Sequence, residues 1–274
     1  NLGTFSDAVG SFTLNGGIVN GSGTLTAATY ALNGGTVNAN LGTGILNQLS
    51  NTTTLNGTSA AGIVNINGGT LVLGASDRLS DSADVTVTNG TLDIGAFNDT
   101  VGTFNLVTGT LTGTGSLSAT TYNLSGSTIN SDLGSGTINQ IANNTVLNGK
   151  SSASAVNING GILTLGAAER LSDTATLTIN SGTSFNLQAF DETVGTLALN
   201  GGNLDGTGTL SAGNYNLSGG TVNAHLGKGT LTQLAGTTIL NGTSAASTIR
   251  IDGGTLTFGA SDRFAITADV TVNN

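Results

Sequence analysis

A short charged segment that occurs three times, together with a single histidine, holds nine of the 22 Lys, Arg, Asp, Glu and His residues of this chain. The segment reads Asp-Arg-Leu-Ser-Asp at 77–81, Glu-Arg-Leu-Ser-Asp at 169–173 and Asp-Arg-Phe-Ala-Ile at 262–266. In the first copy, Asp77, Arg78 and Asp81 could form a local ion pair and cap an outward loop, or could bind a ligand. We expect the structural role, because the third copy loses the pattern after Arg263.

The chain has one histidine and no cysteine, so few of its residues could form a catalytic or metal-binding site. The counterparts of His225 in the other repeats are Asn40 and Asp132, which is typical of an exposed polar position. Neither a nucleophile triad nor a zinc site can be assembled from these residues. The sequence also lacks a tandem calcium-binding nonapeptide and an EF-hand loop. We predict no catalytic, cofactor-binding or metal-binding residues, and we expect a protein that is not an enzyme.

A phosphate loop and a polysaccharide-cleaving site are also disfavoured. The Gly-Thr-Gly motifs at 113–115 and 206–208 precede expected strands, whereas a phosphate loop opens a helix. Polysaccharide-cleaving solenoids need clustered carboxylates or basic residues on one face. The acidic residues of this chain are instead scattered, at places that repeat along the sequence.

The charged segments belong to a long internal repeat, which decides how all other residues are positioned. Three kinds of residue recur with offsets of 92 and 93, namely arginines, tyrosines and phenylalanines (Arg78, Arg170, Arg263; Tyr30, Tyr122, Tyr215; Phe5, Phe97, Phe190). In such an array each unit buries its apolar face on its neighbours. The long repeats span approximately residues 1–76, 77–168 and 169–261, with a partial one at 262–274.

Each long repeat divides into five short units of about 18 residues. Between Gly90 and Gly182, turn signals follow one another at steps of 19, 18, 17, 17 and 21 residues, which fill one 92-residue period. Within a unit, as in 13–19 and 64–71, apolar residues alternate with Thr, Asn or Ser, which predicts a strand. Glycine pairs separate these strands, because glycine tolerates the positive φ of sharp corners.

This pattern predicts an all-β fold, a right-handed parallel β-helix (β-solenoid) with about 18 residues per coil, about 15 coils and five coils per long repeat. A hairpin meander is the competing interpretation, since Asn-Gly between strands favours hairpins. Even turn spacing over the whole chain favours the solenoid, whose coils stack ~4.8 Å apart and would form a rod of roughly 70 Å. We expect residues 1–274 to be one continuous solenoid segment of a longer protein.

Composition and charge exclude several classes of function. Charged residues make up 8% of the chain and the net charge is −9, with no cluster of Lys or Arg. Nucleic acids and anionic membrane surfaces are therefore disfavoured as partners. No apolar run reaches the ~20 residues of a membrane-spanning helix, and no signal peptide is evident.

Three other recurring residue types have a structural and a functional interpretation. Asparagines, including Asn33, Asn38, Asn56, Asn65 and Asn67, could stack into amide ladders from coil to coil or could contact a ligand; we expect ladders. The tyrosines could be half-buried or could form exposed carbohydrate platforms; we expect packing. Thr-x-Thr patterns such as 52–54 and 86–88 suggest an ice-binding face, but they are irregular between coils.

Two longer motifs resemble a known class of bacterial repeats. The stretches GGTLVLGASDRLSD at 68–81 and GGILTLGAAERLSD at 160–173, with 97–104 and 190–197, resemble the autotransporter-associated β-strand repeat. Residues 215–227 resemble repeats of filamentous-haemagglutinin-like exoproteins. The resemblance implies a right-handed β-helical stalk that an outer-membrane translocator exports, and it carries over no catalytic residues.

We expect a non-enzymatic structural segment of a bacterial cell-surface or secreted protein, acting as an adhesin stalk or as an extracellular fibre or biofilm-matrix component. The expected partners are further copies in fibres, or a longer stalk, together with host or surface glycans and the translocator of the parent protein. The first alternative is a β-helix that binds or cleaves carbohydrate. The second alternative is a module that binds ice or a mineral surface.

Overall fold

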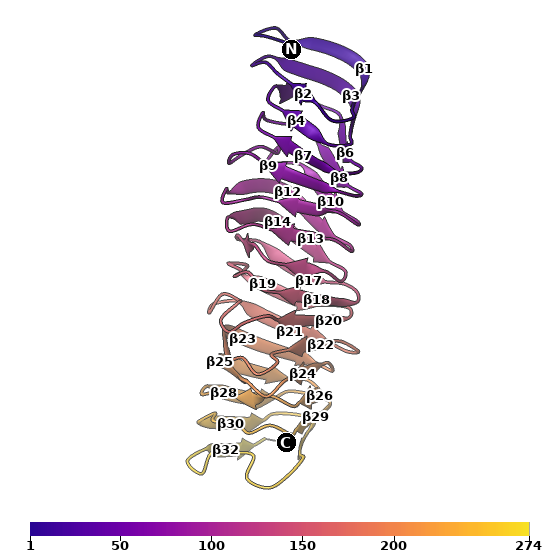
Figure 1. Cartoon of the computed structure of the whole chain (residues 1–274). Coiled ribbons are helices and arrows are strands. Elements are labelled where there is room, and N and C mark those ends of the chain that lie inside the picture. Colours follow the sequence, from indigo (N-terminus) through magenta and orange to yellow (C-terminus); the bar gives the residue numbers. More distant parts are fainter. Residues whose placement is uncertain (274) are drawn as a thin grey trace. The chain divides into compact units, whose positions relative to one another are not determined.

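The chain folds into a β-solenoid of about 15 turns, built of parallel strands joined by short turns (Figure 1). The computed structural model describes residues 1–273, and no helix occurs in that range. Consequently, no described segment is a helix able to cross a membrane. Partner strands are parallel and lie about one coil apart, as when Ile45 pairs with Ile63. The predicted parallel solenoid is confirmed, and the hairpin alternative is wrong.

Two compact units divide the chain, Asn1–Gly136 and Thr137–Asn274. In the first unit, the larger sheet contains β1 (Asp7–Leu14), β3 (Thr24–Leu32), β5 (Asn40–Leu41), β6 (Ile45–Gln48), β8 (Ile63–Ile66), β10 (Asp84–Val87), β12 (Asp99–Leu106), β14 (Ser116–Leu124) and β16 (Asp132–Leu133). The smaller sheet of this unit contains β2 (Ile18–Val19), β4 (Gly35–Val37), β7 (Thr52–Leu55), β9 (Thr70–Leu73), β11 (Thr91–Asp93), β13 (Thr110–Thr112) and β15 (Thr128–Ile129).

The second unit repeats this arrangement. Its larger sheet contains β17 (Thr137–Gln140), β19 (Ala155–Ile158), β21 (Thr176–Asn180), β23 (Glu192–Asn200), β25 (Thr209–Leu217), β27 (His225–Leu226), β28 (Thr230–Gln233), β30 (Thr248–Ile251) and β32 (Asp269–Val272). Its smaller sheet contains β18 (Asn144–Leu147), β20 (Ile162–Leu165), β22 (Ser184–Asn186), β24 (Asn203–Asp205), β26 (Gly220–Val222), β29 (Thr237–Leu240) and β31 (Thr255–Phe258).

Each coil has a third, narrower side where long and short strands meet. The long strand β3 pairs with β5 near its start, at Leu25 and Leu41, and with β6 near its end. An isolated parallel bridge from Leu41 to Ser59 continues this side into the next coil. The charged loops continue this side, because the N–H groups of Ser59, Ser151 and Ser244 donate to the carbonyls of Arg78, Arg170 and Arg263, each at 2.7 Å.

The core lies inside the coils and is made of alternate residues of every strand. In β8, for example, Val64 and Ile66 are fully buried and their neighbours are not. This alternation follows from the strand geometry, which points successive side chains to opposite faces. The strands β1 and β12 begin at equivalent residues, Asp7 and Asp99, with β3, β6, β8 and β10 between them, so five coils fill one period as predicted.

Glycine is required where one coil passes directly over the backbone of another. A Cβ atom on Gly115 would overlap the carbonyl oxygen of Phe97, and Gly208 has the same relation to Phe190. These are the last glycines of the two Gly-Thr-Gly motifs. The motifs therefore serve close packing between coils.

Candidate functional site

The three charged loops are held by hydrogen bonds from their arginine side chains to backbone carbonyl oxygens. The ion pair considered between Arg78 and its neighbours Asp77 and Asp81 is therefore wrong. The guanidinium of Arg78 donates from Nε to the carbonyl of Ser76 at 2.9 Å and from Nη1 to the carbonyl of Asn56 at 2.6 Å. Arg170 and Arg263 repeat this geometry on equivalent carbonyls. One carbonyl of the loop itself, that of Ser76, and one of the preceding coil, that of Asn56, thus take the place considered for Asp77 and Asp81.

A buried carboxylate of the following coil holds each complete loop from the other side. Asp99 Oδ2 accepts the backbone N–H groups of Arg78 at 2.8 Å and Leu79 at 3.1 Å. In the second unit, Glu192 accepts the N–H groups of Arg170 at 2.8 Å and Leu171 at 3.0 Å. We call each arrangement a carboxylate clasp; it ties an arginine loop to the coil that follows it.

Burial raises the pKa of the carboxyl group in both clasps. Asp99 is 2% exposed, and burial raises its pKa to about 6, with the amide donors opposing the shift. Glu192 is fully buried, and burial raises its pKa to about 7. Both values come from the loss of water around the charged form. The sequence contained a signal for this pair that our interpretation missed, since Asp7, Asp99 and Glu192 recur with the long period.

The three repeated tyrosines are core residues, as expected, and are more deeply buried than half. Tyr122 is fully buried, and its hydroxyl accepts from the Ala119 N–H at 2.8 Å and donates to the Leu117 carbonyl at 2.9 Å. Tyr30 and Tyr215 make the same contacts. Burial raises the pKa of the Tyr122 hydroxyl to about 12. Carbohydrate platforms are therefore excluded for these rings.

Asparagine side chains form the expected ladders from coil to coil. Asn38 Nδ2 donates to Asn20 Oδ1 at 2.7 Å, and Asn56 donates to Asn38 at the same distance. Asn65 likewise donates to Asn47. In each of these bonds the amide nitrogen of the later coil faces the amide oxygen of the earlier one, so the ladder has a direction.

His225 occupies the polar position that its counterparts predicted. Its Nδ1 lies 2.8 Å from the hydroxyl of Thr243 and accepts the Thr243 N–H at 3.2 Å. Asn40 makes the equivalent contacts with Thr58 through its side-chain oxygen. The imidazole thus replaces an amide in a contact between coils.

Threonines on the smaller sheet of the first unit are more regular than the sequence indicated. One outward column stacks along β7, β9, β11, β13 and β15 in register, in the order Thr52, Thr70, Thr91, Thr110, Thr128. The column two residues further along contains Val72 and Asp93 between threonines. A paired grid of threonines, which ice binding requires, is therefore interrupted.

Three buried glutamines form hydrogen bonds with the turns at the corners of their coils. We did not predict this role from the sequence. Gln48, Gln140 and Gln233 recur with the long period and are fully buried. Each donates from Nε2 to the carbonyls of the two turn residues that follow, as Gln48 does to Ser50 at 2.8 Å. Their periodic spacing was the available signal.

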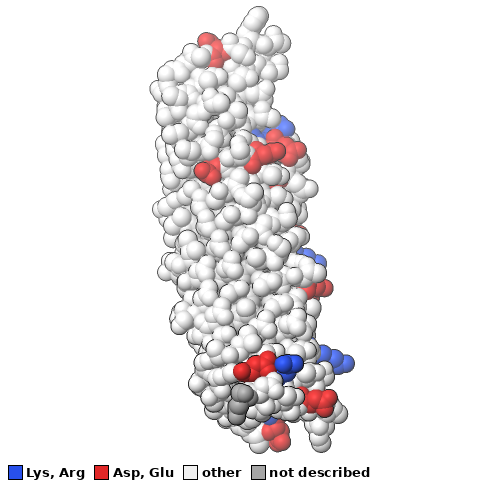
Figure 2. All heavy atoms as spheres, turned by 180° about the vertical axis from the view of Figure 1, so that it is seen from behind, with Lys and Arg blue, Asp and Glu red and all other residues white. Residues whose placement is uncertain are grey.

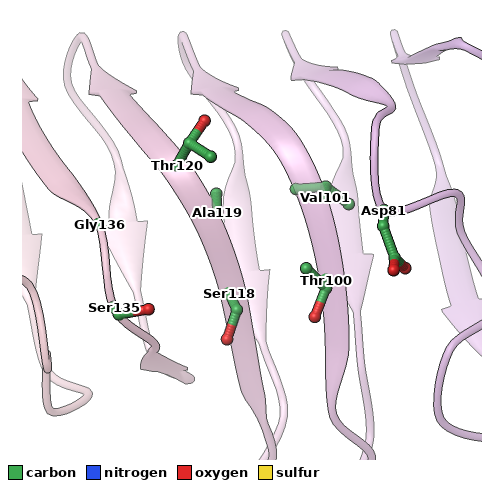
Figure 3. A pocket seen from close by; sticks show the side chains of 8 residues that line it. All are labelled: Asp81, Thr100, Val101, Ser118, Ala119, Thr120, Ser135 and Gly136. Carbon is green, nitrogen blue, oxygen red and sulfur yellow. The ribbon is translucent and has the colours of Figure 1, made fainter.

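An open groove of about 410 Å³ lies on the first unit beside β12 and β14 (Figure 3). Hydroxyl groups of Thr100, Ser118, Thr120 and Ser135 line it, and Asp81 lies at its rim. The residues that line it include no aromatic ring and no basic side chain. Hydroxyls and one carboxylate can form hydrogen bonds with a polar ligand, but they present no group prepared for acid–base or nucleophilic chemistry.

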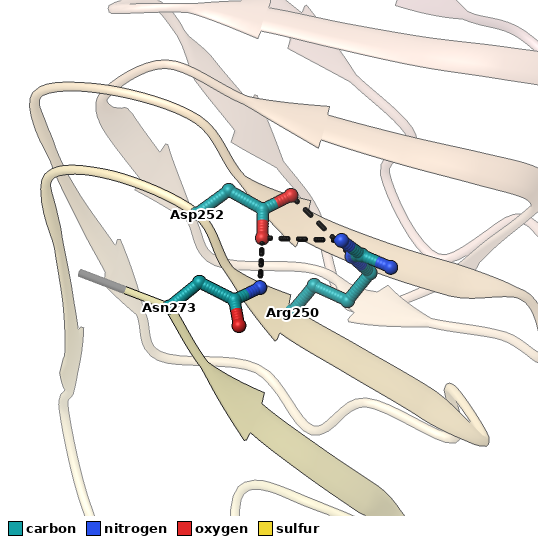
Figure 4. Close-up of polar contacts among 3 residues, drawn as sticks. All are labelled: Arg250, Asp252 and Asn273. Atoms are coloured by element: carbon teal, nitrogen blue, oxygen red, sulfur yellow. Dashed lines mark hydrogen bonds and ion pairs between the residues drawn. The ribbon is translucent and has the colours of Figure 1, made fainter.

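Charged side chains are sparse on the surface, and on the face seen in Figure 2 they occur as small separate groups. Arg250 and Asp252 form an ion pair at 3.4 Å, and Asn273 donates to the same carboxylate at 2.6 Å (Figure 4). The hydrogen bond from Asn273, with the contribution of Arg250, lowers the pKa of Asp252. Among residues 1–273, no three His, Cys, Asp or Glu side chains lie together as a metal-binding group.

Comparisons with known proteins returned no match, whether against models of protein families, curated proteins or solved structures.

Proposed function

We infer that this chain is a structural segment of a bacterial cell-surface or secreted protein, serving as an adhesin stalk or as part of an extracellular fibre. The observation that carries this proposal is the use of the repeated polar residues. The arginines, clasp carboxylates and asparagines that recur with the period bond to neighbouring coils. The recurring tyrosines and glutamines bond to the backbone of their own coil. The first three kinds of residue make contacts between coils, and we infer from this that selection maintains the length and stiffness of the solenoid.

The resemblance of residues 68–81 and 160–173 to autotransporter-associated repeats supports the location outside the cell. Low charge and a surface of Thr, Asn, Ser and Gly also suit an exposed stalk. In this proposal the repeats provide distance between an anchor and a tip, and an outer-membrane translocator exports the parent protein. The segment itself performs no chemistry.

Electron cryo-microscopy of material from the native source tests the proposal. We expect solenoid density with a spacing of ~4.8 Å between coils, on the cell surface or in extracellular fibres. Immunogold labelling with antibodies to this chain supplies an independent location. Labelling confined to the cytoplasm of intact cells would overturn the proposal.

Carbohydrate binding is the second candidate, and the hydroxyl-lined groove is the observation that favours it. Binding of polysaccharide fragments to the purified chain can be measured by saturation-transfer NMR, with Thr120→Arg as the groove variant. Loss of a saturable signal in this variant, with the fold intact, would support a glycan site there. No signal with the unmodified chain would remove this candidate.

A further inference from the structure

We propose that each of the three buried glutamines, Gln48, Gln140 and Gln233, binds one water molecule inside the solenoid through its side-chain oxygen. The proposed site lies at the corner between the larger and the smaller sheet, once in every long repeat. The proposal concerns the interior of the coils and goes beyond the role of the chain as a stalk or fibre. It does not depend on that role.

The side-chain oxygen of each glutamine is a buried acceptor without a donor. Oε1 of Gln48, of Gln140 and of Gln233 is shielded from solvent and has no hydrogen-bond partner within residues 1–273. Buried side-chain oxygens in folded proteins are almost always hydrogen-bonded, either to protein or to ordered water. All three repeats keep the same arrangement, so the glutamine oxygen needs a donor in each of them.

The orientation of the amide group is fixed by the turn that follows. Nε2 of Gln48 donates to the carbonyls of Ser50 at 2.8 Å and Asn51 at 3.0 Å. Nε2 of Gln140 and of Gln233 makes the same pair of bonds. Exchange of the amide nitrogen and oxygen would place Oε1 against two acceptors. The oxygen is therefore the atom that is left without a partner.

The neighbouring coils supply no donor to this oxygen. Gln48 is in register with Leu32 of the preceding coil and with Ile66 of the following coil. Gln233 lies likewise between a leucine and an isoleucine. Because these aliphatic side chains have nothing to donate, the donor has to come from a bound molecule.

A buried threonine on the other side of the turn offers the bound molecule a second partner. Thr53 is fully buried, and its Oγ1 accepts the N–H of Gly34 at 3.2 Å, so its hydroxyl proton can still be donated. Thr238 makes the same bond with Gly219 at 3.2 Å. The residue in register with Thr53 in the preceding coil is Gly35, which has no side chain to fill the space beside the hydroxyl.

Water fits these partners better than a metal ion does. A water molecule can accept from the threonine hydroxyl and donate to Oε1 at the same time. A divalent cation needs several oxygen ligands, usually with carboxylates among them. The carbonyls of Ser50 and Asn51 are already bound by Nε2 of Gln48, which brings amide hydrogens and no negative charge to the corner.

A crystal structure of the 274-residue chain, at a resolution that shows ordered waters, tests the proposal directly. We expect one water about 2.5–3.0 Å from Oε1 in each of the three corners. Corners without this water would overturn the proposal. A direct hydrogen bond from the Thr53 hydroxyl to Oε1 of Gln48 would also overturn it, and so would a metal ion at this place.

Oxygen-17 magnetic relaxation dispersion counts long-lived internal waters in solution and gives an independent test. Gln48→Met keeps the length of the side chain but removes its oxygen, so the amplitude of the dispersion should fall by one water. Adding Gln140→Met and then Gln233→Met should lower it in two further equal steps. Gln188→Met, at the only other glutamine of the chain, changes an exposed residue and should leave the amplitude as it is. An unchanged amplitude in the triple variant would overturn the proposal.

A second pair of variants leaves the glutamine and its turn intact. The changes to methionine also remove the donor of the turn carbonyls, so circular dichroism must show that each variant keeps the β-fold. If a methionine variant does not fold, Thr53→Val takes its place, because it removes the second partner of the water. We expect Thr53→Val to lower the amplitude by one water and Thr54→Val, at an outward position of the same strand, to leave it unchanged. Equal amplitudes for the two valine variants would contradict the proposed site.

Discussion

Strands β10 and β32 have the same sequence, Asp-Val-Thr-Val, and the same place in the repeat, yet their surroundings differ. Val85 and Val87 of β10 are fully buried, whereas Val270 and Val272 of β32 are 51% and 62% exposed. The difference is the coil that follows, since β12 pairs with β10 and no described strand follows β32. Burial in this fold thus depends on neighbouring coils as well as on a strand's own sequence, as expected for a one-dimensional array.

The largest effect is expected from a charge placed at the buried one of two equivalent valines. Val87→Asp introduces a carboxylate into a core with no polar partner, and we expect a loss of about 3–5 kcal/mol of stability. Val272→Asp should cost less than about 1 kcal/mol, because that side chain reaches water. Urea unfolding followed by circular dichroism measures both. Equal losses at the two positions would contradict the role assigned to the following coil.

A smaller loss is expected when a tyrosine hydroxyl is removed from the interior. Tyr122→Phe leaves the Ala119 N–H and the Leu117 carbonyl without their buried partner. We expect a loss of about 1–3 kcal/mol, measured by the same unfolding experiment. Thr120→Val changes an exposed hydroxyl of the same strand and serves as the control, with little expected effect.

The carboxylate clasps predict how stability depends on pH. The folded-state pKa values of Asp99, about 6, and Glu192, about 7, lie above the ordinary values of 3.8 and 4.5. The folded protein therefore holds more protons than the unfolded chain between these limits. This contribution to stability is fully present below about pH 4 and is lost as the pH rises through about 6 and 7.

Thermal unfolding between pH 4.5 and 8 checks this expectation. The double variant Asp99→Asn, Glu192→Gln should show a flatter dependence of melting temperature on pH than the wild type. Thr120→Val, which changes an exposed hydroxyl and no titratable group, should leave the profile unchanged. An unaltered profile in the double variant would show that the two buried groups do not titrate in this range.

The sequence was sufficient to predict what depends on periodicity. The coil length, the five coils per repeat, the buried alternate residues and the asparagine ladders all follow from spacing that strand geometry and stacking make interpretable. The partners of Arg78 could not be predicted in the same way. Its guanidinium binds the carbonyl of Asn56, 22 residues away, and backbone acceptors leave no mark on residue identity. Asp99 was missed because its depth depends on how the third side of the coil closes.

The groove beside β12 and β14 was also invisible in the sequence. Thr100, Ser118 and Ser135 resemble the many other hydroxyl residues of this chain, and they line one hollow only once the coils that carry them are stacked. Shape of this kind depends on loop paths, which a spacing of about 18 residues leaves free.

The smallest predicted effect compares the interior and the end of one asparagine ladder. Asn38 donates to Asn20 and accepts from Asn56, so it makes two ladder bonds, whereas Asn20 makes one. These amides are exposed, so each bond should contribute only about 0.5 kcal/mol. Asn38→Ala should therefore cost about twice as much as Asn20→Ala in urea unfolding of otherwise identical chains. If the two losses are equal, the ladder adds nothing from coil to coil, and the stability of interior coils comes from the apolar core and the clasps alone.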